Sequence, residues 1–153
     1  MAGILNKVED HLNEKNVAYI KEENSVSFIG SIGDNDDYEI EFVSYEDDHQ
    51  ISLFLDYKET ILENKKPIVA EYIVRINSRL PIGALRMNFN AGHVYYKMSN
   101  ILVGQLLTNK IIEKMVGGAL FSMDFSSPGF TAICNEGKSA LEAFTIVESA
   151  LYE

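Results

Sequence analysis

One segment of the sequence carries residue types that could bind a nucleotide. Residues Ala132 to Ser139 read Ala-Ile-Cys-Asn-Glu-Gly-Lys-Ser, a loose match to a phosphate-binding loop with alanine in place of the first glycine. In such a loop, main-chain amides surround the phosphates, the lysine contacts their oxygens and the serine binds Mg²⁺. A phosphate-binding loop belongs to a parallel sheet and must follow one of its strands. The residues after Ser139 predict a single helix and no further strand. We therefore expect a glycine turn and a helix cap. The alternative is a small-ligand- or nucleotide-responsive regulator that uses Lys138 and Ser139.

A run of acidic residues suggests calcium binding. Asp34 begins the sequence Asp-Asn-Asp-Asp, which supplies oxygen ligands. A calcium loop of the EF-hand type that started there would need glycine at position 39 and glutamate at position 45. The sequence has Glu39 and Tyr45 instead. We therefore expect an acidic turn.

The remaining residues with catalytic or metal-binding chemistry are scattered. His11, His49 and His93 fall on a predicted helix, a turn and a strand, without the spacing of a metal site. Cys134, the single cysteine, has no histidine placed near it by the pattern and is expected to be a small, partly buried residue. Because no acid, base and nucleophile converge, we expect neither an enzyme nor a bound metal or cofactor.

Composition and charge limit the partners. The chain has 153 residues, with 13 Lys and Arg against 23 Asp and Glu, and a formal net charge of -10. Lys65 and Lys66 form the only adjacent basic pair, so we expect no nucleic acid as partner. No apolar run approaches the roughly 20 residues of a membrane span. The single cysteine and the absence of a signal-peptide pattern favour a reducing cytoplasm.

The first half of the sequence predicts one helix followed by strands. Ile4, Leu5, Val8 and Leu12 recur at helical spacing and predict a helix over residues 3–15. Alternating apolar residues then predict three or four strands joined by hairpins. These strands are expected at residues 17–20, 26–29, 39–45 and 51–55. Residues 57–66 are expected to form a polar connection.

The second half predicts helices around one hairpin. Pro67 suits the first turn of a helix that ends near Leu80. Residues 84–89 and 93–98 alternate on either side of a glycine-containing loop and predict a hairpin. Thr108 is a suitable cap for a helix ending near Met123. Residues 124–136, which include Pro128, are expected to be irregular, and Ser139 with Glu142 predicts the capping box of a last helix.

These elements predict an α+β fold in a single domain spanning residues 1–153. The order is α-β-β-β(-β)-α-β-β-α-α. Because hairpins need no crossover helix, we expect a mostly antiparallel sheet of about five to six strands with helices packed on one side.

The segment from Tyr72 to Met87, followed by Gly92 to Lys97, resembles the YbjN family, proteins described as proposed bacterial sensory transduction regulators. The family pattern is a helix ending in asparagine, then Leu-Pro-x-Gly, a strand, a glycine turn and a strand with aromatic and basic residues. The matching residues are Asn77, Leu80, Pro81, Gly83, Gly92 and Tyr96. The resemblance extends over about residues 67–151. It implies the fold of type III secretion chaperones, small acidic proteins that often dimerise and hold an extended protein segment.

The matching residues have physical roles of their own. We expect Asn77, Pro81 and Gly83 to fix the angle between the helix and the hairpin and not to bind a ligand. The sequence then predicts a non-enzymatic protein-interaction domain, chaperone-like or regulatory, bacterial, cytoplasmic and homodimeric. Its protein partner is unidentified. We expect tyrosine- and methionine-bearing surface on the second helix and the exposed sheet face to form the interface, with acidic residues at the rim.

Overall fold

The computed structural model describes residues 3–32 and 36–152. Its elements are α1 (Ile4–Glu14), β1 (Ile20–Lys21), β2 (Ser25–Ser31), β3 (Asp37–Tyr45), β4 (Gln50–Thr60), α2 (Lys66–Asn77), β5 (Ala84–Asn88), β6 (His93–Ile101), α3 (Asn109–Glu136) and α4 (Ala140–Ser149). Short 3-10 turns occupy Glu46–Asp48, Glu63–Lys65 and Ala150–Tyr152. The predicted α+β fold is confirmed.

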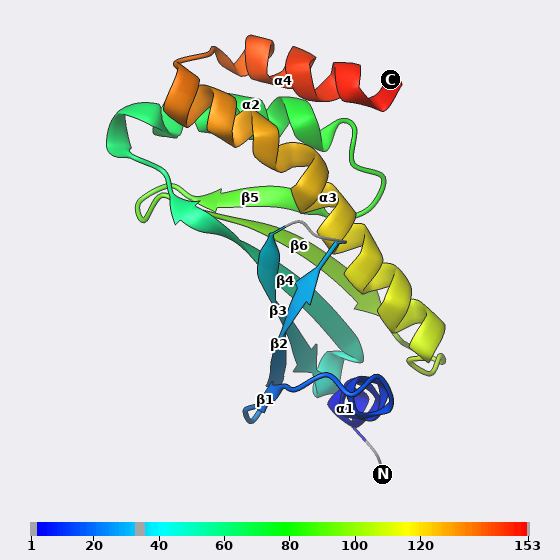
Figure 1. The fold of residues 1–153 in the computed structure, drawn as a ribbon. Coiled ribbons are helices and arrows are strands. Elements are labelled where there is room, and N and C mark those ends of the chain that lie inside the picture. The colour runs from blue at the N-terminus through cyan, green and yellow to red at the C-terminus, as the bar shows by residue number, and fades with distance from the viewer. Residues whose placement is uncertain (1–2, 33–35, 153) are drawn as a thin grey trace.

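The strands form one six-stranded antiparallel sheet in the order β1-β2-β3-β4-β6-β5. Helices α1 and α3 contact the sheet on one side, and α2 and α4 stack on the C-terminal half of α3 (Figure 1). Side chains therefore alternate along each strand between a buried face and a more exposed one. Along β3, for example, Ile40 and Phe42 are buried whereas Glu39 is exposed. We call the sheet face opposite the helices the open face.

The core lies between β4 and the helices. Leu53 and Leu55 of β4 are fully buried, and burying each such side chain contributes about 1.5–3 kcal/mol. Phe130 of α3 connects the layers, because its ring lies 4.9 Å from that of Tyr57 and 5.1 Å from that of Tyr72. This aromatic cluster joins β4, α2 and α3 into one core.

The prediction that residues 124–136 are irregular is wrong, because α3 continues to Glu136 through Pro128. A proline at this position cannot donate to the carbonyl of Asp124, but the hydroxyl of Ser127 donates to that oxygen (3.4 Å). Phe130 and Ile133 lie beyond the proline and are fully buried. The apolar contacts of these side chains offset the local cost of proline, which local propensity alone could not indicate.

The boundaries of two strands also differ from the prediction, by a few residues each. The strand expected at residues 17–20 is only Ile20–Lys21, and β4 extends to Thr60 into the expected polar connection. Tyr57 explains the extension, because its side chain is buried in the aromatic cluster. The predicted caps at Thr108 and Ser139 are confirmed: Thr108 accepts from the Ile111 amide, and Ser139 forms a capping box with Glu142.

Candidate protein-binding surface

The loose phosphate-loop match forms a joint between two helices. Ala132 belongs to the last turn of α3, where carbonyl groups are exposed and main-chain amides are not. Gly137 takes the left-handed conformation (φ 68°) that ends α3, and the Lys138 amide donates to the Ala132 carbonyl (3.0 Å). Ser139 then caps α4. The strand that should precede a phosphate loop is replaced here by a helix, so this geometry does not favour the nucleotide alternative.

The acidic run and the histidines do not converge either. Asp34 lies outside the described residues, and the carboxylate of nearby Asp36 pairs with Lys58 (2.6 Å). His11 is buried on α1, His49 lies in a left-handed turn, and His93 on β6 lies 3.3 Å from Asp56. Within residues 3–32 and 36–152, no three histidine, cysteine or acidic side chains are grouped as metal ligands.

Cys134 lies half-buried on α3. Burial is the main cause that raises the pKa of this thiol, and the negative charge of Glu59 raises the pKa further. A raised pKa keeps the sulfur protonated at neutral pH, and the thiolate is the nucleophilic form. This environment is that of a structural cysteine.

The family-motif residues lie mainly at the corner between α2 and β5. The Asn77 side chain donates to the Leu85 carbonyl (3.1 Å) and accepts from the Leu85 amide (2.8 Å). Gly83 has a φ of 70°, and a Cβ there would lie 2.3 Å from the Tyr96 hydroxyl. That hydroxyl donates to the Ile82 carbonyl. These contacts fit the predicted positioning role of Asn77 and Gly83.

The other motif residues extend this corner. Leu80 is buried, and Pro81 follows it on the exposed surface. Gly92 is buried with a φ of 70°, and its carbonyl accepts from the Ile61 amide (2.8 Å). A Cβ at Gly92 would lie 2.4 Å from the Ile61 carbonyl oxygen. The motif therefore contributes close main-chain approaches at both ends of the β5–β6 hairpin, and its exclusion from ligand binding remains a prediction.

The second helix offers less surface than the sequence predicts. Helix α2 packs against α3, α4 and β5, so Tyr72, Ile73 and Ile76 are buried. Val74 is the exposed large apolar residue of α2. Helix α2 therefore offers little apolar surface to a partner.

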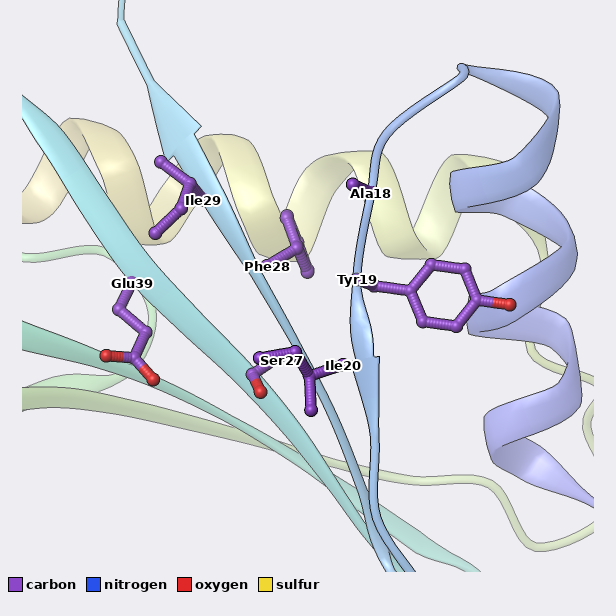
Figure 2. A pocket seen from close by; sticks show the side chains of 7 residues that line it. All are labelled: Ala18, Tyr19, Ile20, Ser27, Phe28, Ile29 and Glu39. Carbon is purple, nitrogen blue, oxygen red and sulfur yellow. The ribbon is translucent and has the colours of Figure 1, made fainter.

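The strongest candidate surface is the edge formed by β1 and β2. Ile20 and Lys21 of β1 pair with Ser27 and Val26 of β2, and the preceding chain at Ala18 turns away from β2 (Figure 2). Beyond Ser27, no strand pairs with this side of β2 in the part of the chain that the structure describes. The result is a free strand edge.

The hydrogen-bonding pattern shows which groups this edge presents. The Ser25 carbonyl accepts from the Glu22 amide on the β1 side. Because antiparallel strands direct alternate residues to opposite sides, Ser27, Ile29 and Ser31 direct their amides and carbonyls to that same side. Ser27 has Ile20 as its partner, whereas no strand among the described residues pairs with the groups at Ile29 and Ser31.

A groove lies beside these groups. It has a volume of about 420 Å³ and is lined by Ala18, Tyr19, Ile20, Ser27, Phe28, Ile29 and Glu39. Figure 2 shows Phe28 between the diverging strands, with Glu39 on the neighbouring strand. Ile20 is 67% exposed and Ile29 is 59% exposed. The edge therefore combines free hydrogen-bonding groups, exposed apolar side chains and a nearby carboxylate. The sequence analysis did not identify this free edge. The features that could have indicated it are the polar break after β1 and the apolar residues Ile20 and Ile29.

The fold of the chain is an antiparallel sheet covered by helices on one face, and this fold places the chain in a structural class. The structure is similar to YbjN from E. coli, described as a proposed transcription regulator, with a TM-score of 0.56, 15% identity, and coverage of 78% of this chain and 86% of that chain. It is also similar to a chain of the HopA1–SchA chaperone–effector complex, with a TM-score of 0.52, 11% identity, and coverage of 78% and 89%.

At these identities the likeness shows a shared fold, and the predicted YbjN-like, chaperone-like architecture is confirmed. Comparison of the sequence with protein-family models and with curated proteins finds no match. Among the described residues, no helix is long and apolar enough to cross a membrane.

Proposed function

We propose that the protein is a non-enzymatic, chaperone-like or regulatory module that binds an extended segment of a partner protein along the free edge of β2. The observation that carries this proposal is the main chain of Ile29 and Ser31, whose outer side pairs with no strand within residues 3–32 and 36–152, beside an apolar groove. An extended segment would add a seventh strand and satisfy these groups by main-chain hydrogen bonds. The chaperone–effector complex among the structural neighbours supports this function class.

The edge also indicates what kind of segment would fit. Alternate side chains of an added strand point to opposite faces of the sheet. One set would lie over Phe28 and Tyr19, which favours apolar residues. The other set would lie beside Ile29 and Glu39, in a chain with a net charge of -10. The expected partner segment alternates apolar with basic residues.

Removing one edge donor tests this proposal. Ile29→Pro deletes an amide that faces away from β3, so the existing sheet should stay intact. The probe is a short labelled peptide in which valine alternates with lysine, followed by fluorescence anisotropy. We expect Ile29→Pro to weaken binding about tenfold, the equivalent of one lost hydrogen bond of about 1.4 kcal/mol.

The matched control is Ile29→Ala, which keeps the amide and removes most of the side chain. It should weaken binding less than Ile29→Pro. Equal binding by wild type and Ile29→Pro, with unchanged melting temperatures, would contradict the edge proposal. Equal affinity for a peptide alternating valine with glutamate would contradict the charge preference.

The wider proposal includes a single domain, a cytoplasmic location and a homodimer. The nucleotide-responsive alternative has a simple test, because a nucleotide that binds the folded state raises the melting temperature. A rise with nucleotide that Lys138→Ala suppresses would favour this alternative over peptide binding.

A further inference from the structure

Another pocket lies between helices α1 and α3, beside β2. It has a volume of about 300 Å³, at the lower end of the range for small-molecule sites. Leu12 of α1 and Ile112 and Val116 of α3 make much of its wall apolar. Phe28 of β2 adds an aromatic ring to this wall. The pocket therefore offers an apolar site for a small molecule.

The wall of this pocket also contains a histidine with an unsatisfied ring nitrogen. His11 belongs to the buried face of α1 and is 7% exposed. Its Nδ1 atom is buried and has no hydrogen-bond partner among the described residues. Buried polar atoms in native proteins are nearly always hydrogen-bonded. A molecule in the pocket that carries one hydrogen-bonding group would satisfy this ring.

The charged side chains that line the pocket pair with each other. The Lys15 ammonium lies 3.7 Å from the Glu113 carboxylate, and these side chains are 58% and 54% exposed. This pair offers no buried positive charge to an anion, and the chain as a whole has a net charge of -10. Burying a charge without a partner is costly, so the pocket favours a neutral molecule.

We propose that this pocket binds a small neutral aromatic molecule that carries one hydroxyl group, a phenol in chemical class. Its ring packs on Phe28 in the offset or edge-to-face contact that aromatic pairs prefer. Its hydroxyl bonds to the His11 imidazole. A hydroxyl can both donate and accept, so it suits either state of a neutral imidazole nitrogen. The site is distinct from the β2 edge, although Phe28 borders both.

Two ligands that differ by one hydroxyl provide a direct test. p-Cresol is toluene with a hydroxyl added to the ring, and titrations followed by two-dimensional NMR give a dissociation constant for each. We expect saturable binding of p-cresol by wild type. His11→Leu removes the imidazole and keeps an apolar side chain in the wall. It should lower the ratio of p-cresol affinity to toluene affinity about fivefold, the effect of one hydrogen bond.

Filling the pocket provides a second test that leaves His11 in place. A Cβ at Gly117 meets nothing within 4 Å, so Gly117→Leu adds a side chain at the pocket without a clash at its base. Because the added side chain takes the space of the ligand, we expect it to weaken both ligands about tenfold. Gly117→Ala is the matched control, and it should weaken them less than Gly117→Leu does.

Three results would each overturn this site: no saturable p-cresol binding, an unchanged affinity ratio in His11→Leu, or unchanged p-cresol binding in Gly117→Leu. The charge argument is tested with 4-methylbenzoate, which carries a carboxylate in place of the hydroxyl and should bind about tenfold more weakly than p-cresol. Equal affinity would overturn the neutral class. Ile29→Pro should bind p-cresol like wild type, so failure of the edge proposal and failure of this site are distinguishable.

Discussion

The two edges of the sheet differ in whether their outward-facing main-chain groups have hydrogen-bond partners. At the β5 edge, the Asn77 side chain bonds to both the amide and the carbonyl of Leu85 and so occupies the place of a neighbouring strand. At the β2 edge, the corresponding groups of Ile29 and Ser31 have no partner strand among the described residues. Free edges invite pairing with other chains, and natural proteins usually block them. Asn77 blocks the β5 edge at Leu85, whereas the β2 edge is open among the described residues, which is why we assign binding to β2.

The largest expected effect concerns the packing of helices above the blocked edge. A Cβ at Gly129 would lie 2.1 Å from the Tyr72 ring, whose hydroxyl donates to the Ser126 carbonyl (2.7 Å). Gly129→Ala must displace a fully buried tyrosine, and we expect it to lower the free energy of unfolding by about 3 kcal/mol. Chemical denaturation measures this loss.

Gly117→Ala is the matched control, because it lies in the same helix and a Cβ there meets nothing within 4 Å. It should raise the free energy of unfolding by up to about 1 kcal/mol. Equal effects of the two substitutions would show that Tyr72 does not pack against α3 as described.

A smaller loss is expected at the turn before β5. Gly83→Ala combines a left-handed backbone with a close approach to the Lys97 carbonyl (2.8 Å), so we expect about 2–3 kcal/mol of destabilisation. Gly104 has the same φ of 70° but open space around it. Gly104→Ala should therefore cost only about 1 kcal/mol. Thermal unfolding of both variants checks whether the close approach adds to the backbone strain.

Asn77→Ala removes the side chain that blocks the β5 edge. We expect it to lower the free energy of unfolding by about 1–3 kcal/mol, since the amide and carbonyl of Leu85 lose their partners. Affinity for the valine–lysine peptide at the β2 edge should stay unchanged. Loss of peptide binding with an unchanged melting temperature would instead make Asn77 a binding residue.

The sequence was informative where local chemistry decides structure. The Ser139 cap, the glycine-containing hairpin loop and the alternation on either side of it follow from short-range rules. Pro128 and Tyr57 were misjudged because their outcome depends on distant partners. Tyr57 packs against Phe130, and α3 continues past Pro128 to bury Phe130 and Ile133. The open β2 edge was missed, because the polar break after β1 and the apolar Ile20 and Ile29 indicate a free edge only once the neighbouring strands are known in three dimensions.

The smallest expected effect is at the joint between α3 and α4. The Ser139 main-chain amide is the first cause that lowers the pKa of Glu142 below its usual value, and the Ser139 hydroxyl is the second. A carboxyl with a lowered folded-state pKa stabilises the protein above its unfolded-state pKa, and this contribution is lost as the pH falls through the folded-state pKa. Melting temperatures of wild type and Glu142→Gln should therefore differ slightly at neutral pH and converge in acid. A difference that grows in acid would contradict the capping box.

The most direct test of the account is amide hydrogen exchange followed by NMR, with and without the valine–lysine peptide. Without peptide, the Ile29 and Ser31 amides should exchange faster than those of Phe28 and Gly30, which bond toward β3. With saturating peptide, the Ile29 and Ser31 amides should become protected while the Leu85 amide, already bonded to Asn77, changes little. Protection that appears elsewhere and leaves Ile29 and Ser31 unprotected would contradict the assignment of binding to the β2 edge.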